Sequence, residues 1–397
     1  MLAAMRNRQP DRVPVAPDMS NMIPCRLTGK AFWEIYLYQD PPLWRAYIDA
    51  ARHFGIDGWI YNLDGFYVSD PAVPPAPSDE TCETVIVERT QERIVTRACT
   101  QCGRQPREWS KLVTVYPRAD PPTWLPAEKV GLAAAPERWW PIEGVKPQKE
   151  GFDLLREALQ LFEGRGVIGA FVGPPQLGNP ECGWGYSIYD YTDRHEAVYQ
   201  WSLTAARDAV AYLKRVLAGP VRPDFILTGG SGLLVFNTPE ILREITLPCM
   251  QEITRICKEA AIPSQIHCCG PERELVRMCA LETDLASINP LEIPPMGDCD
   301  LAELKRLYGH KLGLMGNLHT TDVMLRGTAR DVRRESLKAI RSAGGDGGFI
   351  LSTGDQCGRD TPDENIRAMV EAAREFGTYP LDFGRIDGEI RRLEARP

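Results

Sequence analysis

Short apolar runs recur along this chain and alternate with helix-length amphipathic segments, and this alternation constrains the fold more than any other feature. Gly, Pro or Asp bounds each run, and the apolar residues within a run are continuous, which is typical of parallel strands covered on both faces. We expect strands at residues 12–17, 58–64, 167–173, 224–230, 264–270, 285–291, 312–317 and 347–354.

The segments between these runs predict helices, at residues 195–217, 239–261, 271–281, 328–343 and 362–376. Thr238 before Pro239 and Thr361 before Pro362 have the side chains expected of helix N-caps. Strands that alternate with helices form a parallel sheet, and about eight of them predict an α/β fold closed into a TIM-type (β/α)8 barrel. A doubly wound open sheet is the alternative, although no Gly-x-Gly-x-x-Gly follows any of the runs.

One stretch breaks the alternation. Residues from about 65 to 148 are rich in proline and contain segments of alternating β-type pattern at 84–88, 93–97 and 112–116. We interpret the stretch as a β-rich insertion after the second strand. The expected organisation is therefore a single barrel domain over residues 1–397, with this excursion inserted in it.

Charge and composition narrow the class of protein. The formal net charge is -8, which argues against a general nucleic-acid or anionic-membrane binder because both need a basic surface. No apolar run approaches the roughly 18 residues that cross a bilayer, and charged residues occupy the N-terminal segment where a signal peptide would be apolar. We therefore expect a cytoplasmic protein, in which the 12 cysteines do not form a disulfide framework.

Two of the cysteines lie in a pattern that suits a metal. In His267-Cys268-Cys269-Gly270, a strand would place the side chains of His267 and Cys269 on the same face, at the carboxyl end where barrel active sites form. An imidazole nitrogen and a thiolate in this arrangement can reach one Zn²⁺. Alternatively, His267 is a core histidine and the cysteines are small buried apolar residues.

A third ligand would come from another strand. The last expected strand leads into Gly354-Asp355-Gln356-Cys357-Gly358, so Cys357 lies over the same end of the barrel. One histidine and two cysteines leave the fourth position of zinc open, as a catalytic zinc requires. Two thiolates also suit the metal to activating a sulfur or polarising an oxygen.

Several segments resemble the uroporphyrinogen decarboxylase superfamily. They are IHCCG, the pair Gly316-Asn317 after a strand, GGFILSTGDQCGRDTPDENIRAMVEAARE, the opening DRVPV and SGLLVFNTPEILREITLPCMQEI. Within that superfamily the chain looks most like the zinc-dependent methyltransferases that work with corrinoid proteins, which have a His-x-Cys pair followed much later by a single Cys. His267, Cys269 and Cys357 match this pattern.

The resemblance implies a TIM-type barrel, one zinc ion, and transfer of a methyl group between a small substrate and cobalamin. The substrate would be a thiol, a methyl ether or a methylamine. The Asp-x-His-x-x-Gly pattern of a corrinoid-binding domain does not occur in the sequence, so the cobalamin would be carried by a separate corrinoid protein. A homodimer is the default expectation for the oligomeric state.

Departures from the family keep two other functions open. True uroporphyrinogen decarboxylases carry an arginine-rich RQAGRY-like segment that holds the carboxylates of the substrate, whereas the corresponding region here reads DMSNMIPCRLTGKAFW. A cofactor-independent decarboxylase of this type is therefore the alternative to the methyltransferase. A binding protein with a structural zinc is a third hypothesis, and it predicts unfolding when zinc is removed.

Other candidate residues follow from their positions. Glu292, after the sixth expected strand, would be a displaceable zinc ligand or a general acid/base, or else a surface carboxylate. Asn317, after the seventh, would bind substrate or order the metal ligands. Aromatic and amide residues near the second and third expected strands would bind the substrate. Alternatively, they only pack a long loop. These residues are Trp59, Tyr61, Asn62, Trp184 and Tyr186.

Overall fold

The computed structural model of the chain describes residues 1–72, 80–102, 107–178 and 185–395. Contacts divide the chain into two compact units. The first unit consists of Met1–Ser20, Ala51–Val68 and Gly151–Pro397, and the second of Asn21–Ala50 and Ser69–Glu150. Each unit has its own sheet.

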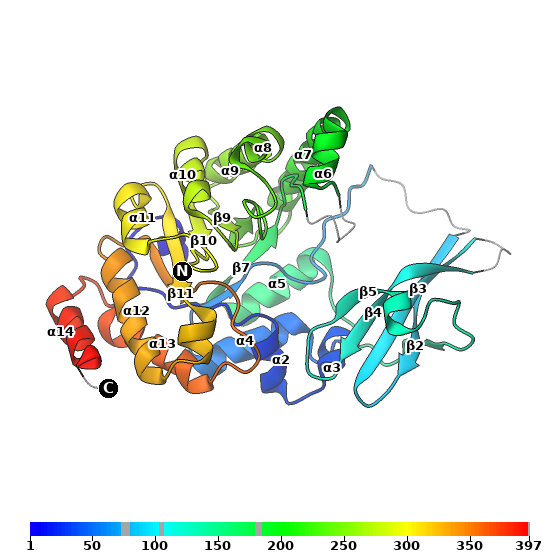
Figure 1. Cartoon of the computed structure of the whole chain (residues 1–397), viewed down its shortest axis with the longest axis horizontal. Coiled ribbons are helices and arrows are strands. Elements are labelled where there is room, and N and C mark those ends of the chain that lie inside the picture. Colours follow the sequence, from blue (N-terminus) through cyan, green and yellow to red (C-terminus); the bar gives the residue numbers. More distant parts are fainter. Residues whose placement is uncertain (73–79, 103–106, 179–184, 396–397) are drawn as a thin grey trace. The chain divides into compact units, whose positions relative to one another are not determined.

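The first unit is built around a parallel sheet of seven strands in the order β1-β7-β8-β9-β10-β11-β12 (Figure 1). Every adjacent pair is parallel, so all the carboxyl ends meet at one edge of the sheet. The strands are β1 (Gly58–Ile60), β7 (Gly166–Phe171), β8 (Phe225–Leu227), β9 (Ser264–His267), β10 (Ser287–Asn289), β11 (Gly313–Leu318) and β12 (Phe349–Thr353).

The segment expected as the first strand closes the ring. Val15 makes an isolated parallel bridge with Leu351 of β12, and the Ala16 N–H donates to the Leu351 carbonyl at 2.9 Å. On its other side, the Val15 carbonyl accepts from the Asp57 N–H at 2.8 Å, immediately before β1. The segment therefore takes the eighth place between β12 and β1, and the TIM-type barrel expected from the sequence is confirmed.

Helices follow the strands and lie outside the sheet (Figure 1). In the first unit they are α1 (Leu2–Met5), α5 (Gly151–Phe162), α6 (Ile188–Asp193), α7 (His195–Ala218), α8 (Pro239–Ile245), α9 (Leu247–Glu259), α10 (Arg273–Glu282), α11 (Leu301–Tyr308), α12 (Ala329–Ala343), α13 (Asp363–Phe376), α14 (Phe383–Glu394) and the π-helix η3 (Thr320–Leu325).

Two details of the expected helices are wrong. The single helix expected over 239–261 is two helices that meet at Thr246, because Pro248 in the first turn of α9 lacks the N–H that would continue α8. Thr238 caps α8, where its hydroxyl accepts from the Ile241 N–H at 3.3 Å. Thr361, by contrast, does not cap α13, whose N-cap is Pro362.

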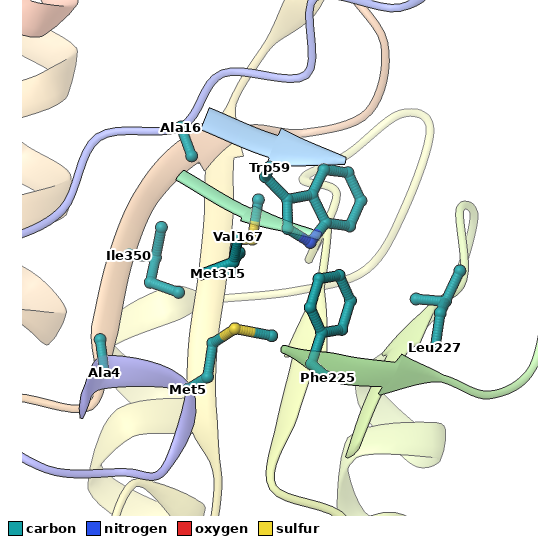
Figure 2. Packing of buried hydrophobic residues seen from close by; sticks show 9 residues of the cluster. All are labelled: Ala4, Met5, Ala16, Trp59, Val167, Phe225, Leu227, Met315 and Ile350. Carbon is teal, nitrogen blue, oxygen red and sulfur yellow. The ribbon is translucent and has the colours of Figure 1, made fainter. Parts of the chain in front are cut away.

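The barrel interior is filled by large apolar side chains from several strands (Figure 2). Trp59 of β1 stacks on Phe225 of β8, with 6.5 Å between ring centroids, and donates its indole N–H to Gln265 Oε1 at 2.7 Å. The other buried members of this cluster are Ala4, Met5, Ala16, Val167, Leu227, Met315 and Ile350. The interior is thus a packed core, which leaves the ends of the strands as the place for chemistry.

The second unit contains the β-rich insertion expected after the second strand. Its sheet is antiparallel, in the order β5-β4-β3-β2-β6. The strands are β2 (Glu80–Arg89), β3 (Arg93–Cys102), β4 (Glu108–Pro117), β5 (Thr123–Pro126) and β6 (Trp140–Pro141), accompanied by α2 (Met22–Thr28), α3 (Phe32–Tyr36), η1 (Ala127–Val130) and the larger part of α4 (Leu43–Phe54).

No helix in the described part of the chain is both long enough and apolar enough to cross a membrane.

Candidate active site

His267 is the last residue of β9, so this strand ends earlier than the sequence pattern indicates. The Cys268 N–H still donates to the Asn289 carbonyl at 2.9 Å, but the chain then turns at Gly270, whose φ is +96°. Cys269 therefore lies in a loop rather than in a strand. The expectation that strand geometry places its side chain on the same face as that of His267 does not apply. Both residues nevertheless lie at the carboxyl end of the barrel.

The imidazole of His267 is held between two polar side chains. Its Nδ1 lies 3.2 Å from Asn289 Nδ2, and its Nε2 lies 3.7 Å from Asp355 Oδ1. The side chain is 13% exposed, and burial lowers the pKa of the imidazole while Asp355 acts in the opposite direction. A neutral imidazole at ordinary pH is the form that binds a metal or accepts a proton.

The thiol of Cys269 is half-buried beside the loop after β8. The Ser231 side chain and the Gly232 N–H interact with it, which favours the thiolate. Burial has the larger effect and raises the pKa of the thiol, assisted by the negative charges of Asp355 and Glu292. Without a cation, Cys269 is therefore a neutral thiol.

Cys357 lies in the loop after β12 and is fully buried. Its thiol lies against the hydroxyls of Thr353 and Thr361. Thr361 thus contacts Cys357 and does not cap α13 as expected from the sequence. Burial raises the pKa of this thiol to about 12, and the charges of Asp18 and Asp355 add to the effect. The Cys357 N–H donates to the Asp18 carbonyl at 2.8 Å, which fixes the loop to the closing segment of the barrel.

The donors fit zinc in kind and in location, because one neutral imidazole and two thiols lie at the same end of the barrel. Within the residues that the structure describes, however, no group of three His, Cys, Asp or Glu side chains is close enough together to hold a metal ion. The charge of Asp355 acts on all three side chains, and the thiol of Cys357 also lies against the hydroxyls of Thr353 and Thr361. The three proposed ligands would therefore have to move closer together to bind one zinc ion.

The site also contains two acidic residues, Asp355 and Asp18, that were not predicted from the sequence. Asp355 influences the pKa values of His267, Cys269 and Cys357, and its φ is 94°, a left-handed conformation that is strained for a residue other than glycine. Asp18 is 6% exposed, and burial raises the pKa of its carboxyl group to about 7. Both follow expected strands directly, so the positional rule that selected Glu292 also applied to them.

A cavity of about 260 Å³ lies beside His267. The described residues that line it are Asp18, Tyr61, Asn62, Phe171, Leu227, Gly229, Gly230, Ser231, His267 and Gln356. They come from six places on the ring but share the carboxyl ends of the strands. No arginine or lysine is among these described lining residues, so Asp18 gives the cavity an acidic wall.

A larger cavity of about 820 Å³ lies at the opposite end of the barrel, where Pro263, Ala286 and Leu312 precede β9, β10 and β11. Loops at the amino ends of barrel strands serve stability, whereas active sites form at the carboxyl ends. The cavity beside His267 is therefore the candidate active site despite its smaller volume.

Glu292 and Asn317 lie at the same end. Glu292 is 6% exposed, and its Oε2 accepts from the Gly270 N–H at 2.5 Å, next to Cys269. Burial raises the pKa of this carboxyl group, Gly270 lowers it, and Asp355 raises it further. Glu292 is thus not a surface carboxylate. Asn317 is a half-buried residue of β11, opposite Ser352 in the ladder with β12.

The expected substrate-binding residues fall into different places. Tyr61 and Asn62 line the cavity beside His267. Trp59 is 2% exposed and belongs to the barrel core, although its ring lies 6.5 Å from that of His267. Tyr186 packs on Trp201, with 5.2 Å between ring centroids, in a cluster with α7 and α8. Trp184 lies outside the described residues.

Comparison with known proteins finds a family similarity over part of the chain and a similar fold over nearly all of it. Residues 205–376 match the family model of uroporphyrinogen decarboxylase (URO-D). The uroporphyrinogen decarboxylase of Anaeromyxobacter dehalogenans is 30% identical over 138 residues, 35% of this chain and 37% of that protein. The one from Legionella pneumophila (strain Corby) is 27% identical over 188 residues, 47% of this chain and 50% of that protein. The chain thus spans half or less of the length of these curated relatives.

Among solved structures, a methyltransferase from Methanosarcina mazei superposes with a TM-score of 0.58, covering 94% of this chain and 97% of that one, at 16% sequence identity. At this identity the likeness is one of fold, and it extends over nearly the whole chain. The segment matched by the family model includes His267, Cys269 and Cys357. Over that segment the chain is similar to the uroporphyrinogen decarboxylase family.

Proposed function

We propose that this protein is a methyltransferase that moves a methyl group between a small substrate and the cobalamin of a separate corrinoid protein. One zinc ion would be held by His267, Cys269 and Cys357. The observation that carries the proposal is the cavity beside His267, where a neutral imidazole borders a small space with no arginine or lysine among its described lining residues.

When bound, zinc would supply Lewis acidity, lowering the pKa of a substrate thiol or withdrawing electrons from an ether oxygen. The residues of the chain have complementary tasks. Asn289 orients the imidazole of His267, and Glu292 holds the Gly270 N–H next to Cys269. Asp355 is placed to accept a proton that leaves the substrate or the ligands, because its carboxylate faces Nε2 of His267.

The packed interior of the barrel is an argument that the cobalamin is carried by a separate protein. Trp59, Phe225 and Met315 fill the interior beneath the site, so a small substrate is held at the end of the barrel where a second protein can approach it. We propose that the corrinoid protein docks over the carboxyl ends of the strands. The fold shared with a methyltransferase is consistent with this arrangement.

A decarboxylase acting without a cofactor is the second candidate, because the matched family model and the curated relatives are uroporphyrinogen decarboxylases. That reaction needs cationic groups around a large polycarboxylate. The cavity of about 260 Å³ has an acidic wall and lies below the range of roughly 300–1,000 Å³ that is usual for drug-sized ligands. Its size and charge therefore favour the methyltransferase.

Metal content and activity test the proposal together. Elemental analysis should find about one zinc per chain in the purified protein and little in Cys357→Ser, with circular dichroism unchanged. Cys279→Ser is the matched control, because Cys279 is also fully buried but lies on α10. The parent should transfer the methyl group of methylcobalamin to a small thiol, and Cys357→Ser should not.

Three outcomes would contradict the proposal. A metal-free parent that decarboxylates uroporphyrinogen would establish the second candidate. Unfolding of Cys357→Ser on loss of zinc, with Cys279→Ser folded, would indicate a structural metal. Equal zinc loss in both variants would mean that Cys357 has no special role.

A further inference from the structure

The cavity beside His267 combines an acidic wall with aromatic side chains. Asp18 lies on one side of it, and Tyr61 and Phe171 contribute rings. Phe171 is 43% exposed, although it is the last residue of β7 and the four residues before it are buried. An exposed aromatic ring beside a buried carboxyl group is an arrangement that attracts organic cations, because the ring face and the carboxylate are both negative.

Asp18 has no counter-ion among the residues that the structure describes. Its side-chain Oδ1 accepts from the Ser20 N–H at 2.8 Å, and no arginine, lysine or histidine in the described ranges forms an ion pair with it. Asp18 is 6% exposed, so its carboxylate gains little from solvent. Burial raises the pKa of this carboxyl group to about 7, so part of it is protonated at neutral pH, and a cation bound in the cavity would favour the ionised form.

The other lining groups fit the same kind of ligand. Burial and the charge of Asp18 raise the pKa of Tyr61 to about 12, so its ring carries a neutral phenol. Asn62 and Gln356 present amide groups to the cavity, and Leu227 adds an apolar surface. If zinc is bound by two thiolates, the metal centre adds no net positive charge, and Asp18 and Asp355 keep the site acidic.

We propose that this cavity binds a small organic cation, such as a methylated ammonium group, with Asp18 as its counter-ion and Tyr61 and Phe171 against its methyl groups. This inference rests on the proposed function in taking the cavity as the substrate site, and it narrows the substrate from thiols, ethers and amines to cationic amines. It concerns recognition of the substrate and adds no chemical step.

Isothermal titration calorimetry tests the proposal by measuring how tightly this chain binds choline and its uncharged isostere 3,3-dimethylbutan-1-ol. Choline should bind at least about tenfold more tightly, the factor that about 1.4 kcal/mol of ion-pair and cation–π attraction provides. Asp18→Asn should reduce the affinity for choline by at least about tenfold and leave that for the alcohol unchanged. Asp387→Asn, on α14, is the control.

Phe171→Leu provides a second variant in case Asp18→Asn does not fold, because Phe171 is half exposed, and it should weaken choline binding several-fold. Equal affinities for choline and the alcohol, or no saturable binding of choline, tetramethylammonium or dimethylammonium, would overturn the proposal.

Zinc content and methylcobalamin activity are measured on the same samples. A zinc-bearing, active protein that prefers the alcohol contradicts only the cation site, whereas a metal-free, inactive protein that binds choline contradicts only the methyltransferase.

Discussion

Asn289 and His267 face each other directly in the ladder between β10 and β9, and the amide nitrogen of Asn289 lies 3.2 Å from Nδ1 of the imidazole. In this arrangement the amide donates to Nδ1, which leaves the ring proton on Nε2, facing Asp355. The Oδ1 atom of Asn289 is buried and has no hydrogen-bond partner in the described part of the chain. Half a turn of the amide would present Oδ1 to a proton on Nδ1 and free Nε2 for a metal.

Asn289→Leu should therefore lower the affinity for zinc by about 10–100-fold, as loss of a ligand-orienting partner does in other metal sites. Asn289→Asp should restore most of it, because a carboxylate accepts the same proton. Competition with a chelator of known affinity measures both. Asn365→Leu is the control, since Asn365 is a buried amide that bonds backbone carbonyls of Met324 and Gly327. Equal zinc affinity in Asn289→Leu and the parent would contradict the orienting role.

Asp355→Asn should retain about one zinc per chain, because the proposed ligands are His267, Cys269 and Cys357. The substitution removes the negative charge near Nε2 of His267 and keeps the shape of the side chain. Asparagine also tolerates the φ of 94° better than most residues, so the fold should persist. Elemental analysis measures the zinc content of Asp355→Asn and of Cys357→Ser. If Asp355→Asn lost zinc as completely as Cys357→Ser, Asp355 would be a zinc ligand.

Gln265→Leu should destabilise the barrel by about 1–3 kcal/mol, because the buried indole N–H of Trp59 would lose its acceptor. Trp59→Phe removes that donor, so the double variant should be less destabilised than the two single changes added together. Urea unfolding followed by circular dichroism measures all three. Strict additivity would mean that the hydrogen bond between Trp59 and Gln265 contributes nothing.

Stability in acid should depend on Glu389, which joins α14 to α12. Hydrogen bonds from Arg392 and then Arg333 outweigh burial and lower the pKa of Glu389 from 4.5 to about 2. A carboxylate with a lowered pKa in the folded state contributes stability that is full above pH 4.5 and lost as the pH falls towards 2. The side chain of Arg392 is 56% exposed, so solvent screening leaves about 1 kcal/mol.

Glu389→Gln should therefore remove about 1 kcal/mol at pH 7 and reduce the difference in stability between pH 7 and pH 3. The control is Glu371→Gln, on the exposed side of α13. Thermal unfolding across that range is the measurement. An unchanged pH dependence in Glu389→Gln would show that the ion pairs of Glu389 do not stabilise the fold.

The sequence by itself determined the barrel and the end of it that carries the chemistry. Apolar runs alternating with amphipathic segments can bury both faces only as parallel strands under helices, and parallel strands bring all their carboxyl ends to one edge. His267, Glu292 and Asn317 could therefore be predicted at one end of the barrel before any of their contacts were known. The spacing of apolar residues and the direction of the chain are local properties, so both can be read from the sequence alone.

The tertiary structure decided which side chains meet at that end. It stopped β9 at His267, brought Asn289 to Nδ1 and Asp355 to Nε2, and placed Cys357 against Thr353 and Thr361. The acidic cavity joins Asp18 to Phe171, which lie on opposite sides of the second unit in the sequence. Such contacts depend on loop conformations and rotamers set by neighbours that are distant along the chain, and no local pattern encodes them.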